Sequence, residues 1–119
     1  MRHFISGHLT FPEGFFESHY QPQIDKALYE NAHFIIGDAP GIDTRAQQYL
    51  NGKTENVTIF HMFEKPRNNI GNWTTNGGYM TDNDRDAAMT AASDIDIAHS
   101  LRNKSGTHKN LLRRQCIKF

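Results

Sequence analysis

One short stretch of the sequence combines the residue types that bind phosphate. An apolar run at 34–36 is followed by a turn sequence at 37–41 (GDAPG), and residues 42–50 then carry apolar side chains at helical spacing. This order predicts a strand, a tight turn and a helix. The N–H groups of such a helix start lack backbone partners and favour an anion at the carboxyl end of the strand. The alternative is a purely structural turn, in which Asp43 is only a favourable acid at a helix start.

Small and polar residues also follow the other predicted strands. Residues 6–8 (Ser-Gly-His) end the first strand, His99 follows the fourth, and residues 105–107 (Ser-Gly-Thr) open a second candidate helix. Because ligands of parallel sheets bind outside the carboxyl ends of the strands, we expect these groups to converge on one crevice. Hydroxyl and N–H groups there would donate to a phosphate, and Asp38 or Asp43 would accept from ribose hydroxyls.

The segment from Phe63 to Met80 is rich in Gly, Asn and Pro, which predicts a long loop beside this crevice. Arg67 is either a bidentate phosphate ligand or a solvated side chain, and Trp73 either stacks on a base or anchors the loop by packing. We expect the loop to act as a lid. The candidate ligand-binding residues are therefore Ser6, Gly7, His8, Gly37, Asp38, Gly41, Asp43, Arg67, Trp73, His99, Ser105, Gly106 and Thr107.

Histidine and cysteine usage bears on metal binding. His8, His61, His99 and His108 fall near predicted strand ends or a helix start, without the HxH or HxxxH spacing typical of metal ligands. We therefore expect no metal and no cofactor, and single polar or capping roles for these side chains. The one cysteine, Cys116, excludes an internal disulfide and favours a reducing compartment such as the cytoplasm.

The charge balance limits the classes of partner. Thirteen Lys and Arg residues match thirteen Asp and Glu residues, so the sequence predicts no broad positive field for duplex nucleic acid. No apolar stretch approaches the length of a membrane span, and residues 1–6 lack the apolar core of a signal peptide. A length of 119 residues suits a single domain over 1–119.

The elements that must position these residues alternate between strand and helix. We predict strands at 3–6, 34–36, 57–60, 94–98 and 116–119. The predicted helices begin at Pro22, Ile42, the Thr81 cap and the 105–107 segment. This order indicates an α/β fold of the Rossmann-like type, a three-layer sandwich with a mainly parallel sheet of about five strands and helices on both faces.

As an ordered set, these motifs resemble the SLOG superfamily. The resemblance rests on residues 4–7 (FISG), 37–43 (GDAPGID) with Ala46, 85–98 and 105–107 (SGT), and it spans nearly the whole chain. Members include the cytokinin-activating phosphoribohydrolases, the bacterial DNA-processing protein and sensor domains of antiphage systems. The resemblance implies a Rossmann-like fold that binds a nucleotide or an ADP-ribose-like molecule, with Gly37, Asp38, Gly41 and Asp43 in one motif and residues 105–107 in the other.

The chain departs from the phosphoribohydrolases at two places. Residues 102–104 (Arg-Asn-Lys) stand where that family has PGG, and Asn110 stands at the position of its glutamate. An amide is not a general base and does not stabilise an oxocarbenium-like centre as a carboxylate does. Nucleotide N-glycosidase activity through Asp38 or Asp43 is therefore the alternative to simple binding of a nucleotide-derived phosphate ligand. A structural or protein-interaction module is the third possibility.

The expected partners follow from this reading. We expect a nucleotide-like small molecule, no duplex nucleic acid, no membrane, and a homodimer or higher homo-oligomer. The apolar connection containing Phe11, Phe15, Phe16 and Tyr20 is expected to contribute part of the contact between copies.

Overall fold

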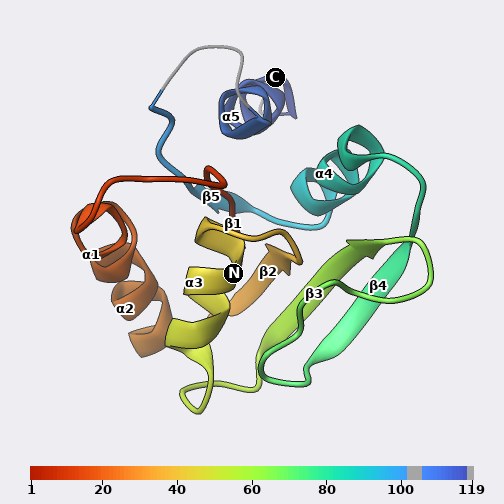
Figure 1. Ribbon diagram of the computed structural model, residues 1–119. Coiled ribbons are helices and arrows are strands. Elements are labelled where there is room, and N and C mark those ends of the chain that lie inside the picture. Colours follow the sequence, from red (N-terminus) through yellow and green to blue (C-terminus); the bar gives the residue numbers. More distant parts are fainter. Residues whose placement is uncertain (102–105, 118–119) are drawn as a thin grey trace.

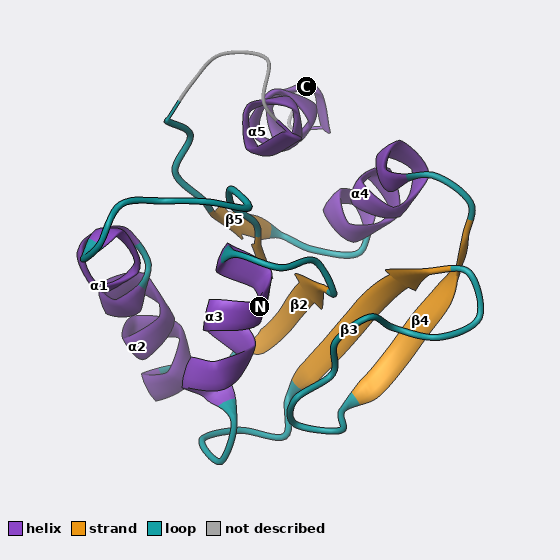
Figure 2. Cartoon of the chain, in the orientation of Figure 1, coloured by secondary structure: helices purple, strands orange, loops and turns teal. Residues whose placement is uncertain are grey.

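A computed structural model describes residues 1–101 and 106–117 as a five-stranded sheet in which every strand pair is parallel. The spatial order is β4-β3-β2-β1-β5, and Figures 1 and 2 show helices on both sides of the sheet. The strands are β1 (Arg2–Ile5), β2 (His33–Gly37), β3 (Val57–Met62), β4 (Thr74–Tyr79) and β5 (Ile95–Ile97). The predicted fold class, a Rossmann-like α/β sandwich, is therefore confirmed.

Two groups of helices cover the two faces. The first group is α1 (Phe15–His19), α2 (Gln21–Tyr29) and α3 (Ile42–Leu50); the second is α4 (Asp82–Ala91) and α5 (Gly106–Ile117). Successive side chains of a strand point to opposite faces of the sheet, so the strands contribute to two separate hydrophobic cores, one on each face. Ile5, Ile36 and Ile59 pack in the cluster that includes the first group, whereas Phe4, Ile35 and Phe60 pack with Met89 of α4.

Local signals in the sequence explain most helix boundaries. Pro22 lies in the first turn of α2, where its missing N–H costs nothing, and Asn31 follows the helix in a left-handed conformation (φ 58°). Gly52 does the same after α3 (φ 85°). Thr81 caps α4 by accepting a hydrogen bond from the Asp84 N–H (3.1 Å). The predicted helix starts at Pro22 and at the Thr81 cap are confirmed.

The segment from Phe63 to Met80 is not one long loop, contrary to the prediction. Its second half forms β4, an exposed edge strand parallel to β3. The strand is polar and contains two glycines, so it lacks the alternation that marks a buried strand. Gly77 is required there because a Cβ would lie 2.0 Å from the ring of His61 on β3.

Two further expectations, one about the aromatic connection and one about the last strand, need correction. The connection before α2 contains the short helix α1, whose Phe15 and Phe16 are buried against this chain's own core, as is Tyr20. These rings are thus unavailable for the predicted contact between copies. The predicted last strand is also wrong, since residues 116–117 belong to α5; Lys118 and Phe119 lie outside the described residues.

Within 1–101 and 106–117, no helix combines the length and apolarity needed to cross a bilayer.

Candidate functional site

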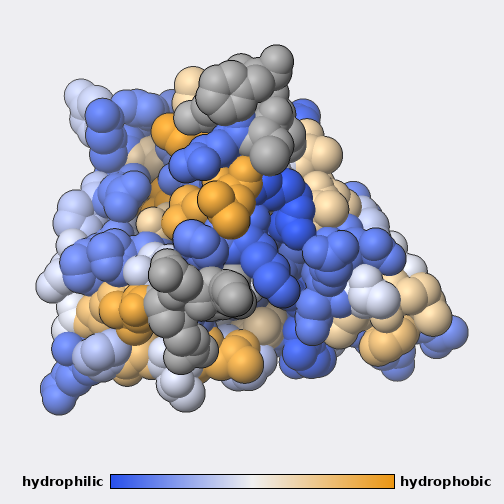
Figure 3. Space-filling view, turned by 90° about the horizontal axis from the view of Figure 1, so that it is seen from above, coloured by the Kyte–Doolittle hydropathy of each residue, from blue (hydrophilic) through white to orange (hydrophobic). Residues whose placement is uncertain are grey.

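A cleft of about 300 Å³ opens at the carboxyl ends of the central strands. The chain leaves β1 toward the face of α1 and α2, and it leaves β5 toward the face of α5, so the two connections diverge and leave a crevice between them. Figure 3 views this end of the molecule, where hydrophilic residues surround smaller apolar patches. The cleft is lined by Phe4, Ser6, Gly7, His8, Leu9, Ala39, Asp43, Arg67, Asp82, Arg85, Asp86, Met89, Gly106, Thr107 and Asn110.

The turn after β1 forms one wall. Gly7 packs directly on Ile42 at the start of α3, where a Cβ would approach the isoleucine side chain to 2.5 Å. The Tyr20 hydroxyl donates to the carbonyl of Ser6 (2.7 Å) and accepts from the N–H of His99 (3.1 Å). Burial raises the pKa of this phenol to about 12, so it stays protonated. Tyr20 thereby ties the ends of β1 and β5 together beneath the cleft.

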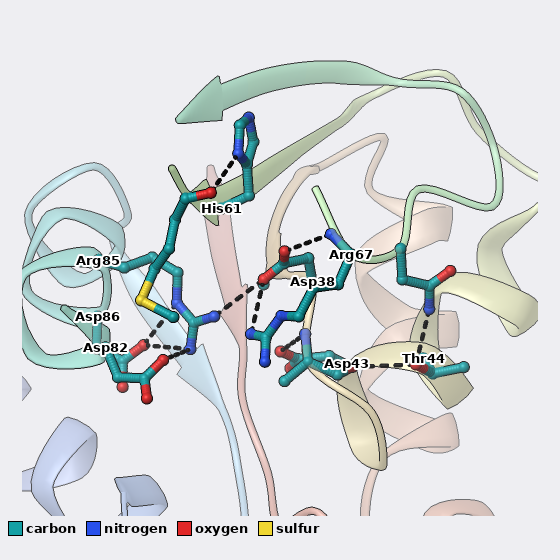
Figure 4. A network of polar contacts seen from close by, with 12 residues as sticks. Asp38, Asp43, Thr44, His61, Arg67, Asp82, Arg85 and Asp86 are labelled. Carbon is teal, nitrogen blue, oxygen red and sulfur yellow. Dashed lines mark hydrogen bonds and ion pairs between the residues drawn. The ribbon is translucent and has the colours of Figure 1, made fainter. Parts of the chain in front are cut away.

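Asp38, at the end of β2, organises a cluster of ion pairs beside the cleft (Figure 4). It accepts from the Nη1 of Arg85 (3.0 Å), the Nη2 of Arg67 (3.0 Å) and the backbone N–H of Arg67 (2.7 Å). Burial alone would raise the pKa of Asp38, but the hydrogen bonds from Arg67 and the charges of Arg67 and Arg85 outweigh it and hold the pKa below its usual value. Asp38 is therefore an ionised anchor for two arginines.

Asp43 differs from Asp38 in the direction of its pKa shift. It lies in the first turn of α3, accepts from the Ala39 N–H (3.2 Å), and is buried at the cleft. Burial raises its pKa to about 7, despite the nearby charge of Arg85. A Cβ on Gly37 would lie 2.5 Å from its carboxylate oxygen. At neutral pH, Asp43 can thus both give and take a proton.

The other wall is α5, and a buried arginine holds it in place. Arg114 donates to Asp96 of β5 (3.1 Å) and to the Ser93 carbonyl (2.7 Å). These contacts leave the first residues of α5, Gly106 and Thr107, at the cleft. Asn110, one turn further on, also lines it, which is where the phosphoribohydrolase resemblance would place a glutamate.

The structure brings together seven of the residues predicted from sequence. Ser6, Gly7, His8, Asp43, Arg67, Gly106 and Thr107 all line the cleft, and Gly37 and Asp38 contact that set from below. The Nε2 of His8 accepts from the Leu101 N–H (2.7 Å), which fixes the side chain within its wall. Ser105 lies outside the described residues.

Three predicted residues lie elsewhere. Gly41 (φ 83°) approaches the backbone of the turn after β1 rather than a ligand, since a Cβ would meet the His8 carbonyl oxygen at 2.4 Å. Trp73 precedes β4 at the opposite end of the sheet, buried in the core with its Nε1 donating to the Thr54 carbonyl (3.1 Å). The packing role is therefore the one the structure supports. His99 stacks on His19 and does not line the cleft.

Gln47 argues against the predicted swinging lid. This fully buried side chain donates to the carbonyls of Gly37 (3.1 Å) and Asn68 (3.2 Å), and it accepts from the N–H of Ile70 (2.9 Å). The loop after β3 is thus pinned to α3 and to the end of β2.

Sequence reasoning missed the contribution of α4. Asp82, Arg85 and Asp86 line the cleft, and Arg85 donates to both Asp38 and Asp86. Arg85 is not among the candidate residues predicted from the sequence, although it lies one helical turn before the buried Met89 and therefore on the buried face. That spacing was the available signal. Among the described residues, no group of three or more His, Cys, Asp or Glu side chains is arranged to hold a metal ion.

Comparison with known proteins supports the fold. No family model and no curated protein sequence matches the chain. Among solved structures, DNA processing protein A from Helicobacter pylori superposes with a TM-score of 0.76 at 19% sequence identity, covering 99% of this chain and 62% of that one. This similarity supports the Rossmann-like fold that the SLOG resemblance implied. The chain spans less than two thirds of that protein.

The same comparison corrects the expected partners. The Helicobacter protein is described as binding single-stranded DNA. The partner of that protein is a nucleic-acid strand, whereas the sequence predicted a nucleotide-like small molecule as the partner of this chain.

Proposed function

We propose that this protein binds single-stranded nucleic acid and holds one sugar–phosphate unit of the strand in the cleft between the turn after β1 and the start of α5. The observation that carries the proposal is the open cleft at the point where the connections from β1 and β5 diverge. Side chains filling this crevice would have favoured a structural module instead. The fold shared with a DNA-binding protein supports the choice of a strand as ligand.

The charges around the cleft suggest how a nucleotide unit lies in it. Gly106 begins a helix of twelve residues, and the positive end of a helix dipole favours a phosphate at such a start. Arg67, whose side chain is half exposed, adds a cation. Asp82 and Asp86 on α4 would repel a phosphate but accept hydrogen bonds from sugar or base. The phosphate therefore faces α5, and the nucleoside faces α4.

The balanced charge of the chain predicts weak salt dependence. Each phosphate neutralised by a protein cation contributes to the slope of affinity against salt concentration. With zero net charge and few cations at the cleft, we expect a shallow slope and little affinity for duplexes. Direct contacts with one or two nucleotides in the cleft, rather than a broad positive electrostatic field, would supply the binding energy.

The test is fluorescence anisotropy with labelled oligo(dT), a duplex of equal length, and two charge variants of α5. Gly106→Glu places a carboxylate at the cleft, and a Cβ there would meet nothing within 4 Å among the described residues outside its own helix backbone. The acid also suits a helix start, so the fold is retained. Gln115→Glu makes the same charge change at the exposed far end of the helix.

We expect the parent protein to bind oligo(dT) in preference to the duplex. Gly106→Glu should weaken that binding at least tenfold, and Gln115→Glu should leave it unchanged. Absence of binding by the parent protein, or equal affinity of the two variants, would contradict the proposal.

Asp43 favours a second candidate, N-glycosidase chemistry on a nucleotide held in the same cleft. A carboxyl group whose pKa burial raises to about 7 is suited to general acid and base catalysis at neutral pH. Asp38 is less suited to proton transfer, because Arg67 and Arg85 hold its pKa below the usual value and their donors occupy both of its carboxylate oxygens. Chromatography of oligonucleotides incubated with the protein would reveal released free base. Release that Asp43→Asn abolishes would support this candidate, and intact strands after hours would exclude it.

A further inference from the structure

Two histidine rings form an exposed stack at the end of β5. His99, which follows the strand, lies parallel to His19 at the end of α1, with ring centroids 4.1 Å apart and an interplanar angle of 14°. Phe15 contacts the His99 ring edge-on at 5.5 Å and the His19 ring at 4.8 Å. Both histidines are exposed, whereas Phe15 is buried. The two histidine rings therefore pack against the buried Phe15 on their inner side and are exposed to solvent on their outer side.

This stack adjoins the cleft through two hydrogen bonds that backbone N–H groups of residues 99–101 donate to side chains. The Tyr20 hydroxyl joins the His99 N–H to the carbonyl of Ser6, which lines the cleft. The Leu101 N–H donates to His8, another lining residue. Residues 99–101 thus run alongside the turn that forms one wall. A strand leaving the cleft on this side would pass over the His99 ring.

We propose that the His19–His99 stack is a second subsite, on which a base next to the nucleotide in the cleft stacks. The proposal rests on the proposed function, strand binding at the cleft. One face of His99 lies against His19, so a base on its other face would extend the stack to three rings. The exposed side chain of Leu101 would add apolar contact.

A nucleobase suits this surface better than other ligands. Every base has a flat π-face, and base–aromatic stacking needs no particular hydrogen-bonding pattern, so it tolerates any sequence. The two rings are already ordered by Phe15, and little side-chain entropy is lost when a base binds. The subsite would therefore add affinity for a strand without adding sequence preference.

The experiment compares oligo(dT) of about eight nucleotides with an abasic strand of equal length, by fluorescence anisotropy. The variants are His99→Ala, which removes the ring, and His99→Phe, which keeps a stacking surface. Tyr29→Ala is the matched control, since it removes a 93% exposed aromatic ring at the end of α2, away from the cleft.

His99→Ala should weaken oligo(dT) binding about 5- to 150-fold and leave the affinity for the abasic strand unchanged. His99→Phe and Tyr29→Ala should bind oligo(dT) like the parent protein. The subsite is wrong if His99→Ala binds oligo(dT) normally, or loses equal affinity for both strands, while Gly106→Glu still weakens binding. If the parent protein binds no strand, or Gly106→Glu has no effect, the proposed function fails and the subsite with it.

Discussion

The Nη1 of Arg85 lies 3.0 Å from Oδ1 of Asp38, and both side chains are almost wholly buried. This ion pair joins the first turns of α4 to the carboxyl end of β2, two segments that are 47 residues apart in sequence. Arg67 shares the same carboxylate from the loop after β3. One aspartate thus sets the relative positions of three elements around the cleft.

Arg85→Leu should lower the free energy of unfolding by about 3–5 kcal/mol, because it leaves the buried charge of Asp38 with only the half-exposed Arg67 as a partner. Arg45→Leu is the comparison, since Arg45 pairs with Glu17 at the surface and should cost no more than about 1 kcal/mol. Urea unfolding measures both. Equal losses would show that burial of the Arg85 pair does not matter.

Asp43 should make stability depend on pH in the acid-to-neutral range. Burial raises its folded-state pKa to about 7, whereas the unfolded chain releases this proton near pH 4. Between these values the folded state binds more protons, so the free energy of unfolding falls as pH rises, by on the order of 1 kcal/mol per pH unit. The contribution is complete below about pH 4 and is lost above about pH 7.

Asp43→Asn tests this dependence because the amide oxygen can still accept from the Ala39 N–H. The difference in unfolding free energy between parent and variant should change between pH 5 and 7 and level off above about pH 7. Burial also raises the pKa of Asp86, and the charge of Asp86 adds to the raised pKa of Asp43, so the difference reports the titration of Asp43 together with its coupling to Asp86. A constant difference across this range would contradict the raised pKa of Asp43.

Gly41→Ala should destabilise the protein more than Gly52→Ala, although the two glycines have nearly the same positive φ angle (83° and 85°). At Gly52 the only cost is backbone strain, about 1–2 kcal/mol, since nothing lies within 4 Å of a Cβ. At Gly41 the new Cβ also collides with the backbone of His8 and Leu9, which should bring the loss to about 3 kcal/mol or more. Thermal unfolding of the two variants makes the comparison, and similar losses would refute the close approach.

Trp73→Ala should reduce stability by about 3–5 kcal/mol and leave oligo(dT) affinity unchanged at temperatures where the variant is folded. The ring is 6% exposed and packs in the core at the end of the sheet opposite the cleft. Its fluorescence should therefore not respond to added strand. Weaker binding with unchanged stability would restore the stacking role considered from the sequence.

The fold class follows from local patterns in the sequence. Apolar β-branched runs at 34–36 and 57–60 alternate with helical stripes such as that of residues 42–50, and these periodicities reflect which side chains face a core. Pro22, Gly52 and Thr81 marked helix ends because their effects depend only on neighbouring backbone. The sequence also predicted that Ser6 and Gly7 after β1 lie near Gly106 and Thr107 at the start of α5, since a parallel sheet brings the carboxyl ends of its strands to one edge. Their role in ligand binding stays a prediction.

Features that depend on partners distant in the sequence could not be predicted from local patterns. β4 is a strand because β3 offers it backbone hydrogen bonds, although its polar, glycine-rich sequence has little strand propensity. Trp73 is buried because α3 and the sheet leave a place for it in the core. Asp38 and Asp43 are five residues apart and chemically identical, yet arginines reach one and burial isolates the other, so their pKa values move in opposite directions. Residue type and spacing carry no information on that difference, because it arises from side chains that approach through space.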